Sequence, residues 1–258
     1  MYSDSCLARF SPCQNRLVPS LQLVWIATLS FALAQPSVQV ITHGPRDQPK
    51  IALTFDADMT YGMKQMLRSG RVRSYNNARI YQILNRTKTK ATFFLSGMWI
   101  ELYPDETKHL AQNPLFELEN HGYSHPSFET PCFGLPKLTD SKASEILKTR
   151  VLLKKVAGVT NRYFRFPGGC QNAGDVALVA KLGLEAVLWD VVGGDGNQPN
   201  KEVIVGNILA RVQNGSIIVL HSHGGPKVPK TADALEEIIP ALKARGFQFV
   251  KLSELLGQ

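Results

Sequence analysis

The sequence predicts an α/β fold organised as one domain, in which about seven strands alternate with helices. Short runs of apolar and β-branched residues recur along the chain and have the length of buried strands. Segments of helical length separate these runs, a pattern typical of parallel sheets. The 258 residues suffice for one α/β barrel or two small domains, and a sequence without repeats or an interdomain linker favours one.

The predicted strands lie near Ile51, at residues 91–95, at 115–118, near Tyr163, and at 186–189, 217–220 and 247–250. The predicted helices lie between them, at residues 78–84, 139–156, 175–182, 202–212 and 232–244. Thr139 and Asp140 are residue types that open helices, so they mark the start of the second helix. Gly246 ends the last helix, because glycine readily adopts the left-handed conformation found at helix ends.

Polar residues stand at the C-terminal ends of several predicted strands. In α/β enzymes the carboxyl ends of parallel strands meet at one edge, where the active sites are built. The residues concerned are Asp56 and Asp58 after the strand at 50–55, Arg165 with the Pro- and Gly-containing turn 166–169, and His221 before a glycine-rich loop. We therefore expect these side chains to share one site.

Two histidines lie four residues apart just after the strand at 115–118. They are His121 and His125, in the loop-like segment 119–126. Neutral imidazole is a good ligand for Zn²⁺, and on a helical turn residues i and i+4 lie on one face. The pair can therefore bind one metal ion if a carboxylate completes the set.

Taken together, these motifs resemble the metal-dependent polysaccharide deacetylases of carbohydrate esterase family four. The five motifs are matched in order by residues 54–58, 121–125, 165–169, loosely 189–195, and 218–221. The resemblance runs from about Lys50 to Leu256 and implies a catalytic domain at 50–258, folded as a distorted, incomplete (β/α) barrel of about seven parallel strands. It also implies hydrolysis of N-acetyl or O-acetyl groups on a sugar polymer.

The resemblance also implies a role for each residue of the motifs. Asp56 resembles the general base, His221 the general acid, and Arg165 the residue that orients the base. His121 and His125 resemble ligands of a divalent metal, for which we expect Zn²⁺, an ion that lowers the pKa of its water to roughly 7. The residues expected to contact substrate are Phe166, Pro167, Gly168, Gly169, Leu220 and Trp189, with Leu220 lining the pocket for the acetyl methyl group.

The first motif departs from the family pattern, because Ala57 stands where the second of two adjacent aspartates acts as the third metal ligand. Alanine cannot bind a metal ion. Asp58 takes over that position, or another group or water completes the coordination, or Asp56 becomes a ligand and the base lies elsewhere. We favour Asp58, because alternate residues of an extended strand point to the same face, which places it beside Asp56.

Two further positions depart from the family pattern. Gly168 replaces the usual aromatic of the third motif, and Val192 replaces an acid of the fourth, which leaves Asp195 as the nearer match. His223 has no counterpart in the resemblance, and we expect it to be a loop histidine that reaches solvent. His43 and His109 have no expected role.

Two other function classes remain open. Ala57 is also compatible with a catalytically silent carbohydrate-binding protein, for which the test is stoichiometric metal binding. The second alternative is a hydrolase of the same fold that acts on a small non-sugar amide or cyclic imide, which would require a pocket closed to polymers.

The N-terminus predicts export. Arg9 and Arg16 precede an apolar run at residues 21–33 that ends in small residues, so we expect residues 1–34 to be a secretory signal peptide. The run is shorter than the roughly 20 residues of a membrane span. We expect a secreted or periplasmic monomer that is not stably inserted in a membrane, with an uncleaved anchor as the alternative. Residues 35–49 are a lead-in segment.

Cysteine content fits an oxidising compartment. Cys6 and Cys13 would leave with the signal peptide, whereas Cys132 and Cys170 would remain in predicted active-site loops. A disulfide between these two is our hypothesis, since isolated cysteines lack the paired spacing of structural zinc sites.

The chain is basic, with a net charge of +8 that becomes +7 without residues 1–34. A basic exported protein suits an anionic envelope polymer. The sequence holds neither a nucleic-acid recognition motif nor a dense Lys/Arg run, so we expect no nucleic-acid partner. Peptidoglycan is therefore the leading expected substrate, ahead of chitin oligomers, other N-acetylglucosamine polymers and acetylated xylan.

Overall fold

The computed structural model describes residues 39–196, 198–226, 228 and 230–257. The predicted signal peptide at 1–34 lies outside the described residues, as do the first four residues of the lead-in segment. The described residues cluster as one compact unit. No helix in the described ranges is long and apolar enough to cross a membrane.

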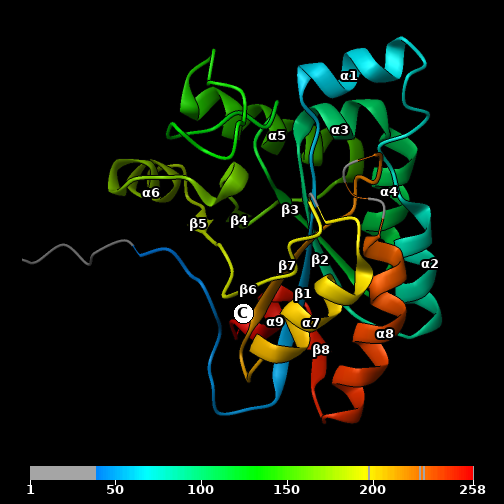
Figure 1. Ribbon diagram of the computed structural model, residues 1–258. Coiled ribbons are helices and arrows are strands. Elements are labelled where there is room, and N and C mark those ends of the chain that lie inside the picture. The colour runs from blue at the N-terminus through cyan, green and yellow to red at the C-terminus, as the bar shows by residue number, and fades with distance from the viewer. Residues whose placement is uncertain (1–38, 197, 227, 229, 258) are drawn as a thin grey trace, which may run out of the picture. The chain divides into compact units, whose positions relative to one another are not determined.

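Every strand pairing in the sheet is parallel (Figure 1). The strands are β1 (Lys50–Ala57), β2 (Ala91–Leu95), β3 (Phe116–Asn120), β4 (Tyr163–Phe164), β5 (Glu185–Ala186), β6 (Val191–Val192), β7 (Ile217–His221) and β8 (Gln248–Val250). Their order is β5-β4-β3-β2-β1-β7-β6, and β8 pairs with the first residues of β1. The strand path stops at β5 and β6 without closing, so the expected incomplete barrel is confirmed.

The lead-in segment lies against the open side of the barrel. Ile41 forms a parallel bridge with Val187 just beyond β5, and His43 forms an antiparallel bridge with Ser216 just before β7. The segment thereby contacts strands from the two separate arms of the sheet. The Ile41 backbone N–H donates to the Ala186 carbonyl at 2.9 Å, which gives the edge strand β5 a further hydrogen-bond partner.

The helices pack along the outside of the sheet (Figure 1). They are α1 (Tyr61–Arg68), α2 (Ala78–Arg86), α3 (Gly97–Leu102), α4 (Pro104–Gln112), α5 (Lys142–Ala157), α6 (Ala173–Lys181), α7 (Lys201–Arg211), α8 (Thr231–Ala244) and α9 (Leu252–Leu255), with a 3₁₀ turn η1 at Pro167–Gly169. The five predicted helices are confirmed as α2 and α5 to α8. The sequence analysis missed α1, α3, α4 and α9, which are short or lack a regular apolar stripe.

Two predicted boundaries are wrong in detail. Helix α5 begins at Lys142, because Ser141 is the residue whose side chain accepts from the Ser144 backbone N–H. The predicted strand at 186–189 is misplaced, because β5 ends at Ala186 and pairs with β4, whereas β6 begins at Val191 and pairs with β7 at the other end of the sheet. The chain between them crosses from one arm of the sheet to the other, which a local apolar pattern does not reveal.

Strand β1 is buried on both faces, and its alternation separates the core from the site. Leu53, Phe55 and Ala57 belong to the large apolar cluster that packs under the helices. Thr54 and Asp56 point to the opposite face, because successive side chains of a strand alternate. Asp56 therefore lies inside the barrel at the carboxyl end of the central strand.

Candidate metal centre and active site

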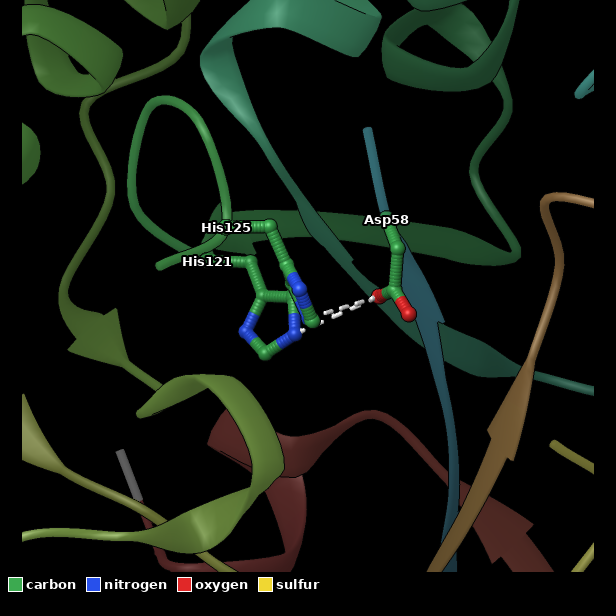
Figure 2. A group of neighbouring side chains, drawn as sticks. All are labelled: Asp58, His121 and His125. Atoms are coloured by element: carbon green, nitrogen blue, oxygen red, sulfur yellow. Dashed lines mark ion pairs between the residues drawn. The ribbon is translucent and has the colours of Figure 1, made fainter. Parts of the chain in front are cut away.

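Asp58, His121 and His125 form the one group of potential metal ligands found among the described residues (Figure 2). One ligand atom from each lies within 4.8 Å of the others. Asp58 Oδ1 is 3.2 Å from His125 Nε2 and 3.5 Å from His121 Nε2. Both imidazoles are buried and the carboxylate is half-buried. The structure thus brings Asp58, rather than Ala57, to the two histidines.

The segment that carries the two histidines is a loop, as expected, and not the helical turn considered for their spacing. Residues 121–126 form a loop in which Gly122 and His125 have positive φ angles of 77° and 56°. Glu145 of α5 holds this loop, because its carboxylate accepts from the backbone N–H groups of Tyr123 and Ser124, each at 2.8 Å. The Ser124 hydroxyl donates to the same carboxylate at 2.9 Å. Glu145 is a supporting residue that the sequence analysis missed, because its partners lie 21 and 22 positions earlier.

The protonation pattern of the histidine loop fits a bound cation. His121 Nδ1 is 2.9 Å from the Arg165 carbonyl oxygen, which can only accept, so Nδ1 carries the proton of a neutral ring. The Nε2 lone pair then faces Asp58 Oδ1, and both buried atoms lack a hydrogen-bond partner. Acceptors that face each other in a buried site are stabilised by a cation between them. One carboxylate and two imidazoles are a donor set suited to Zn²⁺ and similar divalent ions.

Asp56 lies beside the candidate metal ligands and is paired with Arg165. Its Oδ1 accepts from Arg165 at 2.8 Å, and its Oδ2 is 3.6 Å from His121 Nε2. Arg165 is fully buried and also donates to Thr54 Oγ1 at 2.8 Å. Burial lowers the pKa of Arg165, and the charge of Asp56 opposes that shift. The arrangement holds one oxygen of Asp56 and leaves the other directed at the metal ligands.

His221 approaches the same carboxylate from β7. Its Nε2 is 3.9 Å from Asp58 Oδ2, and its Nδ1 lies 2.8 Å from Asp195 Oδ1. Asp195 is itself buried and accepts from the His221 backbone N–H and from the Thr231 hydroxyl. Burial by itself lowers the pKa of His221, but the nearby charge and hydrogen bond of Asp195, with the charges of Asp58 and Asp56, raise it to about 10. His221 is therefore poised to carry a proton at neutral pH.

The fourth motif divides between two places. Asp195 supports His221, whereas Asp190 pairs with Arg46 at 2.8 Å and accepts from the Ile217 backbone N–H. Val192 is exposed on β6. Of the two acids in this motif, only Asp195 therefore contributes to the candidate site.

His223 differs from the expectation of a solvent-facing loop residue. It is buried, with Nε2 3.5 Å from Asp58 Oδ2 and Nδ1 2.6 Å from the Gly224 carbonyl oxygen. Gly224 and Gly225 have positive φ angles of 66° and 84°, which turn the chain back over the site. The signal that could have found it is the His-x-His spacing directly after a buried strand.

The expected substrate contacts are only partly in position. Phe166 is wholly buried in an aromatic cluster with Phe128 and Phe164, so it is a packing residue. Leu220 lies on the outer face of β7, beside Gly193 and in the apolar cluster under the helices. Those two expectations are therefore not supported by their positions. Val219 shares the inner face with His221 instead, because alternate strand residues do so.

The turn after Arg165 lies next to the histidine loop. Pro167 is buried, and Gly168 and Gly169 have positive φ angles of 64° and 73°. Trp189 is half-buried, and a Cβ added to Gly169 would lie 3.0 Å from its ring, so glycine is needed for that approach. The Trp189 ring also lies 5.5 Å from the Arg165 guanidinium. Trp189 thus lies between Gly169 and Arg165, the residue that holds the candidate base.

A disulfide joins Cys132 to Cys170 in the structure. Cys132 belongs to the loop that follows His125, and Cys170 directly follows the turn at Pro167–Gly169. The bond thus connects the loop after the metal ligands with the turn after Arg165.

Comparison with known proteins agrees with this geometry. Residues 43–187 match the family model described as polysaccharide deacetylase. The chain belongs to the polysaccharide deacetylase family. A peptidoglycan-N-acetylglucosamine deacetylase of Bacillus cereus is 31% identical to it over 234 residues, which cover 90% of this chain and 74% of that protein.

Solved structures of polysaccharide deacetylases share the fold. The crystal structure of the Bc1960 peptidoglycan N-acetylglucosamine deacetylase has a TM-score of 0.70 and 28% identity, covering 84% of this chain and 92% of its own. A family-four pseudoenzyme from Bacillus anthracis has a TM-score of 0.68 and 24% identity, covering 85% and 69%, and that likeness concerns the fold alone. As a polysaccharide deacetylase, the protein is a hydrolase of acetylated polysaccharides, and Asp58, His121 and His125 form a possible site for the metal on which such enzymes depend.

Proposed function

We propose that this polysaccharide deacetylase removes N-acetyl groups from peptidoglycan, with Zn²⁺ held by Asp58, His121 and His125. The observation that carries the proposal is that a candidate acid and a candidate base lie beside the metal ligands. The candidate acid His221 lies near Asp58, and the candidate base Asp56 lies near His121. Amide hydrolysis needs an activated water, stabilisation of charge at the carbonyl oxygen and a proton for the departing amine. A zinc ion at this site would supply Lewis acidity and lower the pKa of water to roughly 7.

Asp56 acts as the general base in this proposal. Its Oδ2 is free to accept a proton from the attacking water, because Arg165 engages Oδ1. Arg165 fixes the orientation of the carboxylate through this hydrogen bond and places a positive charge beside it. Asp56 Oδ2 lies 3.6 Å from His121 Nε2, so the base is next to the metal ligands.

His221 acts as the general acid. It donates a proton from Nε2 to the departing amine, while Asp195 keeps Nδ1 protonated and stabilises the charged ring. The charge and hydrogen bond of Asp195 raise the pKa of His221, which favours the protonated ring at neutral pH. Within the described part of the chain no carboxylate contacts Nδ1 of His121 or His125, and both serve instead as metal ligands.

Peptidoglycan is proposed on the basis of charge, predicted export and family relatives. Residues 35–258 carry a net charge of +7, which suits an anionic envelope polymer. The Bacillus cereus relative is named for peptidoglycan. We propose further that the mature protein is a secreted or periplasmic monomer. Other N-acetylglucosamine polymers remain the next substrates to test.

The decisive experiment measures metal content and acetate release for the mature wild type and for Asp58→Ala. We expect one metal per wild-type chain and acetate from peptidoglycan, with both lost in Asp58→Ala. Asp105→Ala is the matched control, because Asp105 lies on α4 with an 84% exposed side chain. Metal binding without acetate from any polymer would redirect the search to small amides, and a wild type that binds no metal would favour a silent binding protein.

A further inference from the structure

Phe133 is the most exposed large apolar side chain of the described residues, at 89% exposure. A phenyl ring in water contributes almost nothing to the stability of the fold, because its apolar surface is not buried. Single exposed apolar residues are common on protein surfaces. Phe133 stands out because its backbone is also unfavourable.

The backbone of Phe133 adopts a left-handed conformation, with φ 46°, and Gly134 follows with φ 72°. The Leu135 backbone N–H donates to the Cys132 carbonyl at 2.8 Å, which closes a tight turn of the class that favours Asn and Gly. A bulky L-residue is strained in this conformation. Neither the exposed ring nor the backbone of Phe133 therefore serves the stability of the fold.

The loop that carries Phe133 is held at its base and its tip. At the base, Ser127 and Lys137 form a bridge, and the Ser127 backbone N–H donates to the Pro136 carbonyl at 2.9 Å. At the tip, the Cys132–Cys170 disulfide attaches the loop to the turn after Arg165. A loop held in this way presents its side chain with little further loss of entropy on binding.

Phe133 also lies on the catalytic side of the barrel. Its loop begins two residues after His125, and its ring atom Cδ2 lies 3.5 Å from the position that a Cβ on Gly168 would occupy. A Cβ at Gly168 would clash with Cys132 Sγ at 2.7 Å, so only glycine admits the loop tip here. The ring of Phe133 therefore lies directly beside Gly168, in the turn that follows Arg165.

We propose that Phe133 is a stacking platform for one sugar ring of the polysaccharide. This ring neighbours the sugar whose acetyl group is removed. The C–H face of a pyranose packs against an aromatic face, which removes apolar surface of both from water. This inference rests on the proposed function, because it takes a polysaccharide as the occupant. Phe133 contacts the polymer and takes no part in the proton transfers.

The test is co-sedimentation of the mature, disulfide-intact protein with insoluble, N-acetylated peptidoglycan. The variants are Phe133→Asn, which removes the ring but suits the left-handed turn, and Phe133→Trp, which keeps an aromatic face. We expect the Kd to rise roughly two- to tenfold in Phe133→Asn, the range given by one aromatic contact, and to stay within twofold in Phe133→Trp. Val151→Ala removes another exposed apolar side chain, on α5, and should bind as wild type.

Equal binding by wild type and Phe133→Asn would overturn the inference while leaving the proposed function intact, and so would equal losses in the Asn and Trp variants. If wild type binds neither peptidoglycan nor another N-acetylglucosamine polymer, the proposed substrate fails and the platform fails with it. Metal content and Tm of each variant show whether the fold is retained.

Discussion

Asp195 controls the protonation of His221 through the bond to Nδ1. Replacing Asp195 by Asn removes the negative charge that outweighs burial, so the pKa of His221 falls from its raised value of about 10. A general acid works only below its pKa, and the alkaline limb of the rate profile should therefore move to lower pH in Asp195→Asn. We expect kcat at neutral pH to fall by roughly 10²-fold or more. Acetate release measured across pH checks this, and an unshifted alkaline limb would argue against His221 as the acid.

His223 Nε2 faces Asp58 Oδ2 and thereby helps to orient the Asp58 carboxylate toward His121 and His125. We expect His223→Phe to weaken metal affinity, because it removes the only side-chain nitrogen near Oδ2 other than that of His221 among the described residues. His223→Gln should restore part of the affinity, since its amide can reach a similar position. The measurement is the metal Kd by competition with a chelating dye. His109→Phe, on the exposed surface of α4, is the control, and equal affinities in all variants would contradict a role for His223.

At the scale of elements, the histidine loop depends on helix α5 through Glu145. Glu145→Ala leaves two backbone N–H groups and a hydroxyl without their partner, at a cost of roughly 1–3 kcal/mol for each buried group. We expect a lower Tm together with weaker metal binding, and an intermediate effect in Glu145→Gln, which retains one acceptor oxygen. Glu202→Ala, on the exposed first turn of α7, should change neither property. A drop in Tm with unchanged metal affinity would show that Glu145 supports the helix but not the site.

The elements differ in how well the sequence predicts them. Strands β1, β2 and β7 were predicted because they are continuous apolar runs buried on both faces. Strand β3 extends two residues beyond the predicted end at 118. The prediction stopped there because Glu119 and Asn120 are polar. Glu119 is nevertheless buried, and it accepts from the backbone N–H groups of Arg162 and Tyr163. Those partners are more than forty residues away in the sequence, so no local pattern predicts the contact.

At the scale of the whole molecule, the metal should couple the ends of strands β1 and β3. Asp58 follows β1, and the histidines follow β3, so a shared ion stabilises the folded state over the unfolded chain. At free Zn²⁺ about 1,000-fold above Kd the gain is roughly 4 kcal/mol, which corresponds to a rise in Tm of roughly 10 °C. Chelation should lower the Tm, added Zn²⁺ should restore it, and Asp58→Ala should lose most of this response. A Tm insensitive to chelator would contradict a metal bound by these residues.

The sequence by itself determined the α/β class, the alternation of strands and helices typical of a parallel sheet, and all the candidate residues around Asp58 except His223. It could do so because buried strands consist of continuous apolar runs, and because metal and acid–base chemistry requires a few residue types at strand ends. Only the tertiary structure decided that Asp58 meets the two histidines, that His223 is buried beside it, that Leu220 and Phe166 pack in the core, and that Phe133 stands exposed at a fixed loop tip. These outcomes depend on contacts between residues far apart in the chain, and burial is a property of the assembled fold rather than of any one segment.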